Sequence, residues 1–152
     1  MLAKLLLPHS FKKIGWYLFI PSTIISILIS ITGYEASWLT TKVFAVFNTE
    51  FFGKSQYFTS IQANITNTMV GALFIVGAIF VGFSKEKIED EFIENIRLSS
   101  LLWAVWVNYI LLLFSFIFIY GTAFMSVMIY NMFTVMLIFI LRFNYIIHRH
   151  TK

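Results

Sequence analysis

The feature that most constrains the fold is an uncharged run over residues 101–141, LLWAVWVNYILLLFSFIFIYGTAFMSVMIYNMFTVMLIFIL. A single helix of that length would measure about 60 Å, which is twice the roughly 30 Å thickness of the hydrocarbon core of a bilayer. The run must therefore fold back on itself. Gly121 marks the turn, because glycine readily adopts the positive φ that tight turns require. This predicts two antiparallel membrane spans, over residues 99–120 and 122–141.

Two further apolar stretches, residues 14–33 and 66–83, complete a set of four predicted spans. Hydrophobic residues make up 59% of the chain and charged residues 12%, against roughly 45–50% and about 25% in ordinary soluble domains. A soluble domain of this size could not bury so much apolar surface. The first stretch exceeds the 7–15 residues of a signal-peptide core, so we expect it to be retained. We predict an all-α fold, a four-helix transmembrane bundle forming a single membrane domain over residues 1–152.

Lysine and arginine are distributed unevenly between the two ends of the predicted spans. If both termini are cytoplasmic, nine of the 11 Lys and Arg residues fall on the inner side, and only Lys42 and Lys54 fall outside. Because cytoplasmic loops carry an excess of these residues, we expect a multi-pass protein of the bacterial inner membrane with both termini cytoplasmic. Residues 34–65 then form an external loop, and the apolar residues within 42–52 predict a short helix that lies in the interface or caps the bundle.

The segment SKEKIEDEFIENIR, residues 84–97, holds eight of the 18 charged residues of the chain. Ser84 is a candidate N-cap, and no Gly or Pro follows it before the third span. We therefore expect one helix from about Lys85 to Tyr120, with residues 85–98 extending into the cytoplasm. Such an extension is either a solvated helix face or a docking site for a soluble protein. Its excess of acids disfavours adhesion to anionic lipid. The candidate partner-binding residues are Ile88, Glu91, Phe92, Glu94, Ile96 and Arg97.

Three sequence stretches carry a resemblance to known proteins: KEKIEDEFIENIRLSSLLW, KKIGW before the first span, and YNMFTVM in the last. Together they resemble a group of small uncharacterised bacterial membrane proteins with four predicted helices, and the similarity covers most of the chain. The core EDEFIENIR also resembles the membrane-proximal segment of other small bacterial membrane proteins, which are often encoded beside small helix-turn-helix regulators. The resemblance implies a signalling or regulatory role and carries no established activity.

Neutral polar residues occupy the middle of the third and fourth predicted spans. Asn108 and Asn131 lie 13 and 10 residues from Gly121, so their depths in the membrane differ by only about 5 Å. Two amides at similar depth on adjacent helices predict an interhelical hydrogen bond. The alternative is a pocket for a lipid, a quinone or another apolar ligand. The candidate lining residues of that pocket are Trp106, Asn108, Tyr109, Tyr130 and Asn131.

Ionisable residues are missing from the interior of every predicted span, and the chain has no cysteine. Proton pumps, carriers of charged substrates and b-type haem proteins are therefore disfavoured, as are thiol catalysis and cysteine-based zinc sites. We expect no enzyme, no cofactor, no metal site and no nucleic acid partner. The expected function is regulatory or scaffolding, exercised through the charged helix, and the alternative is transport or binding at the mid-membrane pocket. The expected partners are the lipid bilayer, a soluble cytoplasmic regulator and a second copy of the chain.

Overall fold

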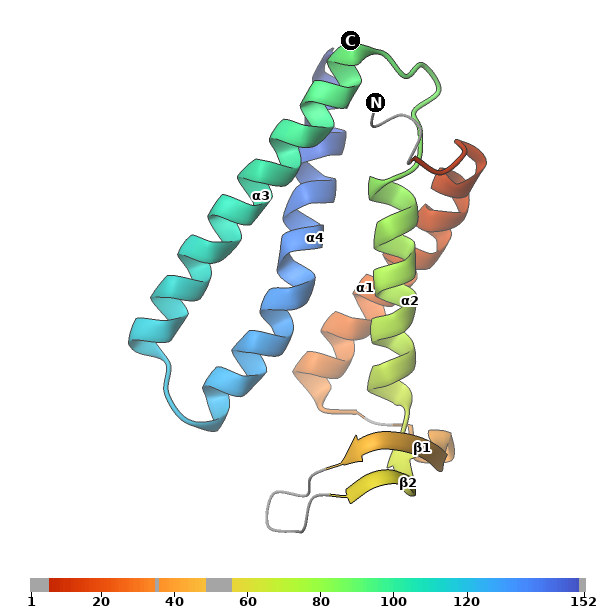
Figure 1. The fold of residues 1–152 in the computed structure, drawn as a ribbon, viewed down its shortest axis with the longest axis vertical. Coiled ribbons are helices and arrows are strands. Elements are labelled where there is room, and N and C mark those ends of the chain that lie inside the picture. Colours follow the sequence, from red (N-terminus) through yellow and green to blue (C-terminus); the bar gives the residue numbers. More distant parts are fainter. Residues whose placement is uncertain (1–5, 35, 49–55, 151–152) are drawn as a thin grey trace. The chain divides into compact units, whose positions relative to one another are not determined.

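The computed structural model describes residues 6–34, 36–48 and 56–150. The protein is mostly helical (75%), with four helices and a small two-stranded sheet in these residues. Figure 1 shows these elements, and their bounds are α1 Ser10–Thr32, the 3₁₀ helix η2 Ser37–Leu39, β1 Thr40–Asn48, β2 Gln56–Asn64, α2 Thr66–Gly82, α3 Glu91–Phe118 and α4 Thr122–His150.

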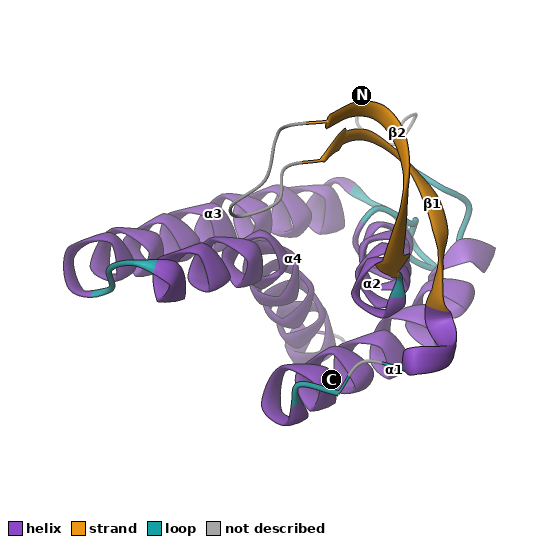
Figure 2. Cartoon of the chain, turned by 90° about the horizontal axis from the view of Figure 1, so that it is seen from below, coloured by secondary structure: helices purple, strands orange, loops and turns teal. Residues whose placement is uncertain are grey.

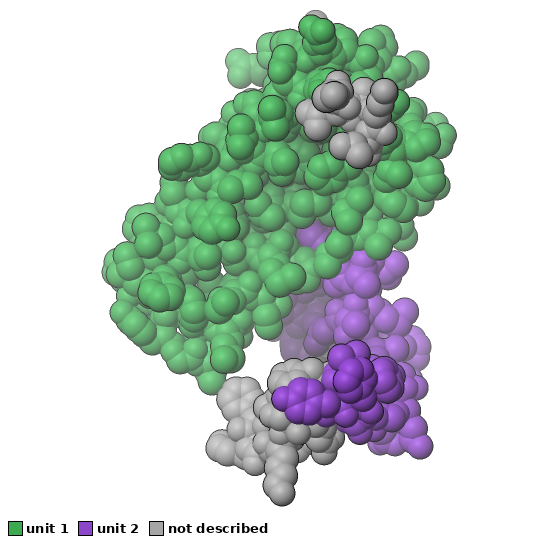
Figure 3. Space-filling view, in the orientation of Figure 1, with its two compact units in different colours: residues 1–20, 75–152 green, residues 21–74 purple. Residues whose placement is uncertain are grey.

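Two compact units divide the chain, and Figure 3 distinguishes them by colour. The first unit comprises residues 1–20 and 75–152, and the second comprises residues 21–74. Both boundaries fall inside helices, so α1 and α2 each contribute one part to each unit.

The dominant feature of the first unit is the antiparallel pair formed by α3 and α4, which lie side by side in Figures 1 and 2. Gly121, between the two helices, has a φ of 73°. The predicted turn at Gly121 is therefore confirmed, because residues other than glycine rarely adopt this conformation. Fully buried residues of this unit gather toward the end of the pair that is remote from the turn, and they include Phe139, Ile140 and Phe143.

Three helices are long and apolar enough to cross a membrane, namely α1, α3 and α4. The fourth, α2, is also apolar but has only 17 residues, which corresponds to about 26 Å. Most of the large apolar side chains on these helices are exposed, as in Ile31 (77%) and Phe118 (72%). Exposed apolar surface on helices of this length matches a lipid environment.

The residues between α1 and α2 contain a β-hairpin in place of the predicted interfacial helix. Strands β1 and β2 pair antiparallel, from Thr40 opposite Asn64 to Asn48 opposite Gln56. The prediction of a helix over 42–52 is therefore wrong for residues 42–48, while 49–52 lie outside the described residues. Both strands are rich in Thr, Val, Phe, Tyr and Ile, which fit a pleated surface well. The all-α prediction is corrected accordingly to a mostly helical fold that includes a small sheet.

The start of α3 also differs from prediction. The helix begins at Glu91, and the Asp90 side chain accepts a hydrogen bond of 2.9 Å from the Ile93 N–H as its N-cap. The predicted N-cap at Ser84 and the predicted helix over residues 85–90 are therefore wrong. Asp is among the strongest N-cap residues, and Glu91 lies in the first turn, where the helix dipole favours an acid.

The ends of the α3–α4 pair also depart from the predicted spans. Helix α3 ends at Phe118 and not at Tyr120, and α4 continues to His150, nine residues beyond the predicted end at 141. The charged residues after 141 do not interrupt the helix, because Arg and His near a helix C-terminus interact favourably with its dipole.

Candidate functional site

The non-helical segment between α2 and α3, residues 83–90, is named the α2–α3 linker here. It forms a short parallel bridge with the N-terminal residue Leu7. The Leu7 N–H donates to the Phe83 carbonyl at 3.0 Å, and the Lys85 N–H donates to the Leu7 carbonyl at 2.9 Å. These two bonds engage the Phe83 carbonyl and the Lys85 N–H, so the chain that follows α2 is held in a non-helical conformation beside Leu7.

An ion pair between Arg97 and Glu89 ties the linker to α3. Arg97 Nη1 lies 2.5 Å from Glu89 Oε1, and Nη2 lies 3.3 Å from Glu89 Oε2. Arg97 Nη2 also donates to the Ser84 carbonyl at 3.2 Å, and Glu89 Oε2 accepts from the Glu86 N–H at 2.7 Å. The guanidinium lies 4.9 Å from the centre of the Phe143 ring. Both charged side chains are mostly buried, so each charge depends on the other for compensation.

A second ion pair joins the linker to α1. Lys12 Nζ donates to Glu86 Oε1, and both side chains are mostly buried. The Lys12 ammonium also lies 5.9 Å from the Phe143 ring. The linker is therefore held by charge on two sides, from α1 and from α3.

A pocket of about 430 Å³ opens beside this clamped linker. We name it the end pocket, and its lining residues come from the linker, the first turns of α3 and the last turns of α4: Glu86, Lys87, Ile88, Asp90, Phe92, Ile93, Ile96, Ile147 and His150. The rings of Phe92 and His150 meet edge to face, with centroids 5.4 Å apart. The lining thus combines five apolar side chains with the charged residues Glu86, Lys87 and Asp90.

The predicted partner-binding residues divide into two groups in the structure. Ile88 (74% exposed) and Phe92 (52% exposed) line the end pocket, as does the buried Ile96. Arg97 is only 7% exposed and is engaged by Glu89, so it supports the site from inside. Glu91 and Glu94, also predicted, belong to the first turn of α3 and are not among the lining residues.

Sequence reasoning missed the residues that complete this site from other parts of the chain. Ile147 and His150 close the pocket from α4, and Lys12 holds the linker from α1. Lys12 and Glu86 are 74 residues apart in sequence, so no local pattern could have paired them. The one available signal was the second charge-rich stretch at the end of α4, which an antiparallel pair places beside the start of α3.

Asn108 and Asn131 form a reciprocal amide pair between α3 and α4. Asn108 Nδ2 donates to Asn131 Oδ1 at 3.0 Å, and Asn131 Nδ2 donates to Asn108 Oδ1 at 3.2 Å. The predicted interhelical hydrogen bond is confirmed. Asn108 is only 7% exposed, so its polar atoms are kept from lipid by the partner amide.

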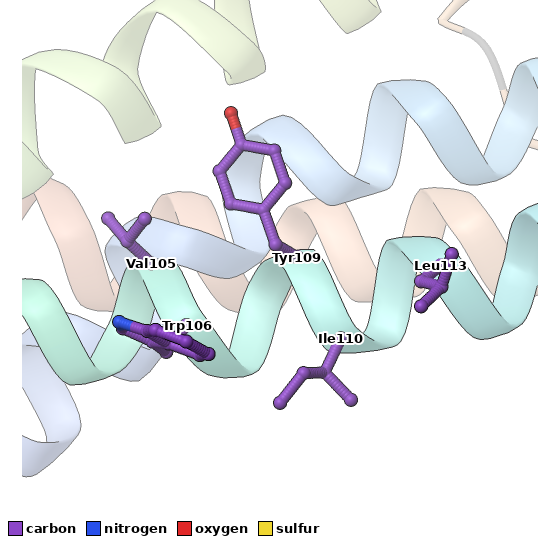
Figure 4. A pocket seen from close by; sticks show the side chains of 5 residues that line it. All are labelled: Val105, Trp106, Tyr109, Ile110 and Leu113. Carbon is purple, nitrogen blue, oxygen red and sulfur yellow. The ribbon is translucent and has the colours of Figure 1, made fainter.

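The other candidate mid-membrane residues lie apart from this pair. A hollow of about 340 Å³ is lined by side chains of α3 alone, namely Val105, Trp106, Tyr109, Ile110 and Leu113. Figure 4 shows how these side chains lie along the helix. Trp106 and Tyr109 are 72% and 65% exposed, and Tyr130, on α4, is 50% exposed and is not part of the hollow. Of the five predicted pocket residues, Trp106 and Tyr109 line this hollow, while Asn108, Tyr130 and Asn131 are not among its lining residues.

Comparison with known proteins gives no match: no protein-family model, no curated protein and no solved structure is similar to this chain. Within the described residues, no group of three or more His, Asp or Glu side chains is placed to hold a metal ion.

Proposed function

We propose that this chain is a small multi-pass protein of the bacterial inner membrane, with both termini in the cytoplasm, that docks a soluble regulatory protein at its cytoplasmic end. Three helices that could cross a membrane support the location. The orientation is supported by the distribution of Lys and Arg, nine of which lie at the termini and in residues 84–97 or just after residue 141, since such residues favour the cytoplasmic side.

The end pocket is the observation that carries this proposal. Helix α3 has 28 residues, or about 42 Å, so its first turns extend beyond a hydrocarbon core of about 30 Å. Ile88 and Phe92 are exposed apolar side chains. In the proposed orientation they face water, with no lipid to cover them. An exposed apolar patch with a polar border is the usual mark of a protein contact.

The partner that fits this pocket is an amphipathic helix that carries basic residues beside its apolar face. Its apolar side chains would enter between Ile88 and Phe92, as in other helix-in-groove contacts. Its basic residues would face Asp90, which is exposed and lines the pocket at the start of α3. The ion pairs of Arg97 and Lys12 engage Glu89 and Glu86 and fix the wall of the pocket, while Asp90 is in neither ion pair.

The alternative function, a mid-membrane site for an apolar ligand, has less support. Its hollow is lined by side chains of a single helix, whereas small-molecule sites usually enclose most of the ligand surface. The two amides that could orient a ligand, Asn108 and Asn131, are engaged with each other.

Photo-crosslinking in cells tests the docking proposal. A crosslinking amino acid is placed at Phe92 or Ile88, inside the end pocket, and at Asn95 as the matched control, because Asn95 is exposed on the same turns of α3 but does not line the pocket. We expect one recurring soluble protein to be captured from positions 92 and 88 and not from position 95. Replacing Asp90 with Asn, which is also a good N-cap residue, should weaken that capture by removing the charge that faces the partner.

Two outcomes would overturn the proposal. Crosslinks from position 92 that reach only lipid, or only other residues of this chain, would show that the pocket is covered without a partner. Equal capture of many proteins from positions 92 and 95 would show that the surface has no selectivity.

A further inference from the structure

The β-hairpin of the second unit is fixed at the ends of two apolar helices. The Ala36 N–H donates to Thr66 Oγ1 at 3.2 Å, and the Ala36 carbonyl accepts from Asn64 Nδ2 at 3.0 Å. Ala36 follows α1 by four residues, and Thr66 is the first residue of α2. The Ile65 N–H also donates to the Leu39 carbonyl at 3.2 Å. The base of the hairpin therefore lies at the depth where α1 ends and α2 begins.

The strands run across the axis of α2, as Figures 1 and 2 show. Each strand has nine residues, which corresponds to about 30 Å, whereas a helix with its side chains is only about 10–12 Å wide. A hairpin that starts at the membrane boundary and runs along it must extend beyond the helix ends to which it is attached.

The distal half of the hairpin exposes large apolar side chains. Phe44, Val46 and Phe58 are 68%, 59% and 71% exposed. In the register of the sheet, Phe44 is opposite Ser60, so Val46 and Phe58 occupy the same face as Phe44. The rings of Phe44 and Phe58 are 6.4 Å apart. On the other face, Val43 and Ala45 are only partly exposed, whereas Thr41 and Tyr57 are exposed.

Phe58 also adopts an unusual backbone conformation, with a φ of 51°. The ladder pairs Ala45 with Thr59 and Phe47 with Tyr57 but does not include a pair of Val46 with Phe58. A bulky residue with positive φ inside a strand is strained, and such strain usually accompanies a functional constraint. Here the strained position carries one of the two exposed rings that gather on this face.

From this placement we propose that the β-hairpin is a membrane-contacting element whose face bearing Phe44, Val46 and Phe58 rests on the lipid of the leaflet at the Thr66 end of α2. Aromatic side chains are favoured at the membrane interface, where the ring is shielded from water and the backbone remains hydrated. A two-stranded hairpin is only marginally stable in water, so contact with lipid would also stabilise its pairing. The element belongs to the second unit and the docking site to the first, so the two proposals are tested independently.

Single-cysteine labelling tests this proposal, because the chain has no native cysteine. A polarity-sensitive fluorophore is attached at position 44, 46 or 58, and at Thr41 as the control, since Thr41 is exposed on the other face of β1. Each labelled protein is reconstituted at one copy per lipid nanodisc, with or without spin-labelled phosphatidylcholine. We expect a blue-shifted emission and a loss of fluorescence with spin-labelled lipid at 44, 46 and 58, and neither effect at 41.

A second variant tests the contribution of the rings themselves. With the label at position 46, the double substitution Phe44→Glu and Phe58→Glu should return the emission to that of a water-exposed fluorophore, and thermal unfolding followed by tryptophan fluorescence verifies that the helices still fold. Labels at 44, 46 and 58 that are as exposed to water as the label at 41 would overturn the proposal. A blue-shifted emission that requires two copies per disc and is unaffected by spin-labelled lipid would overturn the proposal in favour of contact between copies of the chain.

Discussion

Arg97 and Glu89 form a two-bond ion pair that connects α3 to the segment preceding it, with contacts of 2.5 Å and 3.3 Å. Arg97 lies on the first turns of α3, and Glu89 lies in the α2–α3 linker, which forms one wall of the end pocket. The pair therefore links the helix that enters the membrane to the surface that we propose as a docking site. Its removal should affect both the stability of the protein and the capture of a partner.

Replacing either member of this pair should destabilise the protein. Glu89→Gln leaves the Arg97 guanidinium buried without its counter-charge, and Arg97→Gln leaves the carboxylate in the same position. Removing one partner of a buried ion pair typically costs about 3–5 kcal/mol. We expect a loss at the lower end of this range, measured as the free energy of unfolding in mixed micelles.

A double-mutant cycle tests whether Glu89 and Arg97 stabilise the protein through their interaction with each other. The double variant Glu89→Gln with Arg97→Gln should lose clearly less stability than the two single losses added together, because neither charge then remains uncompensated. The control is Glu91→Gln, which removes an exposed acid and should change stability little. Strictly additive single effects would show that the two side chains do not interact in the folded protein.

Loss of the amide pair of Asn108 and Asn131 should cost less stability than loss of the ion pair. Interhelical hydrogen bonds in membranes contribute about 0.6 kcal/mol each, so Asn108→Leu or Asn131→Leu should lose about 1 kcal/mol of unfolding free energy. The double variant should lose little more than either single variant, because both amides are then absent. Ser115→Ala is the control, since Ser115 Oγ bonds only to the Leu111 carbonyl within its own helix.

The same variants distinguish structure from ligand binding. If the amides serve packing alone, the double Leu variant retains the crosslinked partner at position 92. Loss of function without loss of stability in that variant would favour the mid-membrane ligand site instead.

Because α1 and α2 are in close contact within the first unit, we expect a larger residue at Gly77 to destabilise the protein. A Cβ atom added at Gly77 would lie 2.7 Å from the Phe19 backbone nitrogen, which cannot move without displacing α1. Gly77→Ala should therefore destabilise the protein by about 1–3 kcal/mol, the usual cost of overpacking, although alanine is the better helix former.

Gly82→Ala provides a comparison for this prediction. A Cβ at Gly82 would lie 2.6 Å from Phe139 Cε1, which is the edge of a side chain. The ring can rotate or shift, so Gly82→Ala should cost less than Gly77→Ala in the same thermal unfolding measurement. Equal tolerance of the two substitutions would mean that α1 and α2 are more widely separated at Gly77.

The membrane helices could be predicted because their signals are local. An apolar run without charge defines α3 and α4 together, and Gly121 defines the point at which they separate. Counting residues from that turn was sufficient to match the depths of Asn108 and Asn131, because antiparallel helices with a fixed turn have a fixed register.

The hairpin could not be predicted with the same rules, because its signal is ambiguous and partly non-local. The apolar residues of β1, such as Val43, Phe44 and Phe47, fit a helix face and a strand about equally well over so short a stretch. Whether this stretch forms a helix or a strand depends on its pairing with β2, which supplies the hydrogen bonds of the ladder. Pairing between separated segments cannot be derived from the pattern of either segment alone.

The structure of the charged segment, residues 84–97, could be predicted only in part. Its residues after Asp90 are helical as predicted, but Lys85 to Asp90 are held by Leu7, Lys12 and Arg97, two of which come from the N-terminal region. Long-range contacts override helix propensity here. These contacts keep the linker, which forms one wall of the end pocket, out of the helix.

Gly121 offers the most direct test of the α3–α4 turn. Its φ is 73°, and a Cβ atom added there would meet nothing within 4 Å. Steric space is therefore not the constraint, and only the backbone conformation opposes substitution.

Gly121→Val should lose about 1–2 kcal/mol of unfolding free energy, the cost of the left-handed conformation for a residue with a Cβ. Gly121→Asn should lose less, because Asn tolerates this conformation better. The measurement is the free energy of unfolding of the three proteins in the same mixed micelles. If Val and Asn were tolerated equally, the turn would have to adopt a negative φ at this position, and the register that pairs Asn108 with Asn131 would then need a different turn.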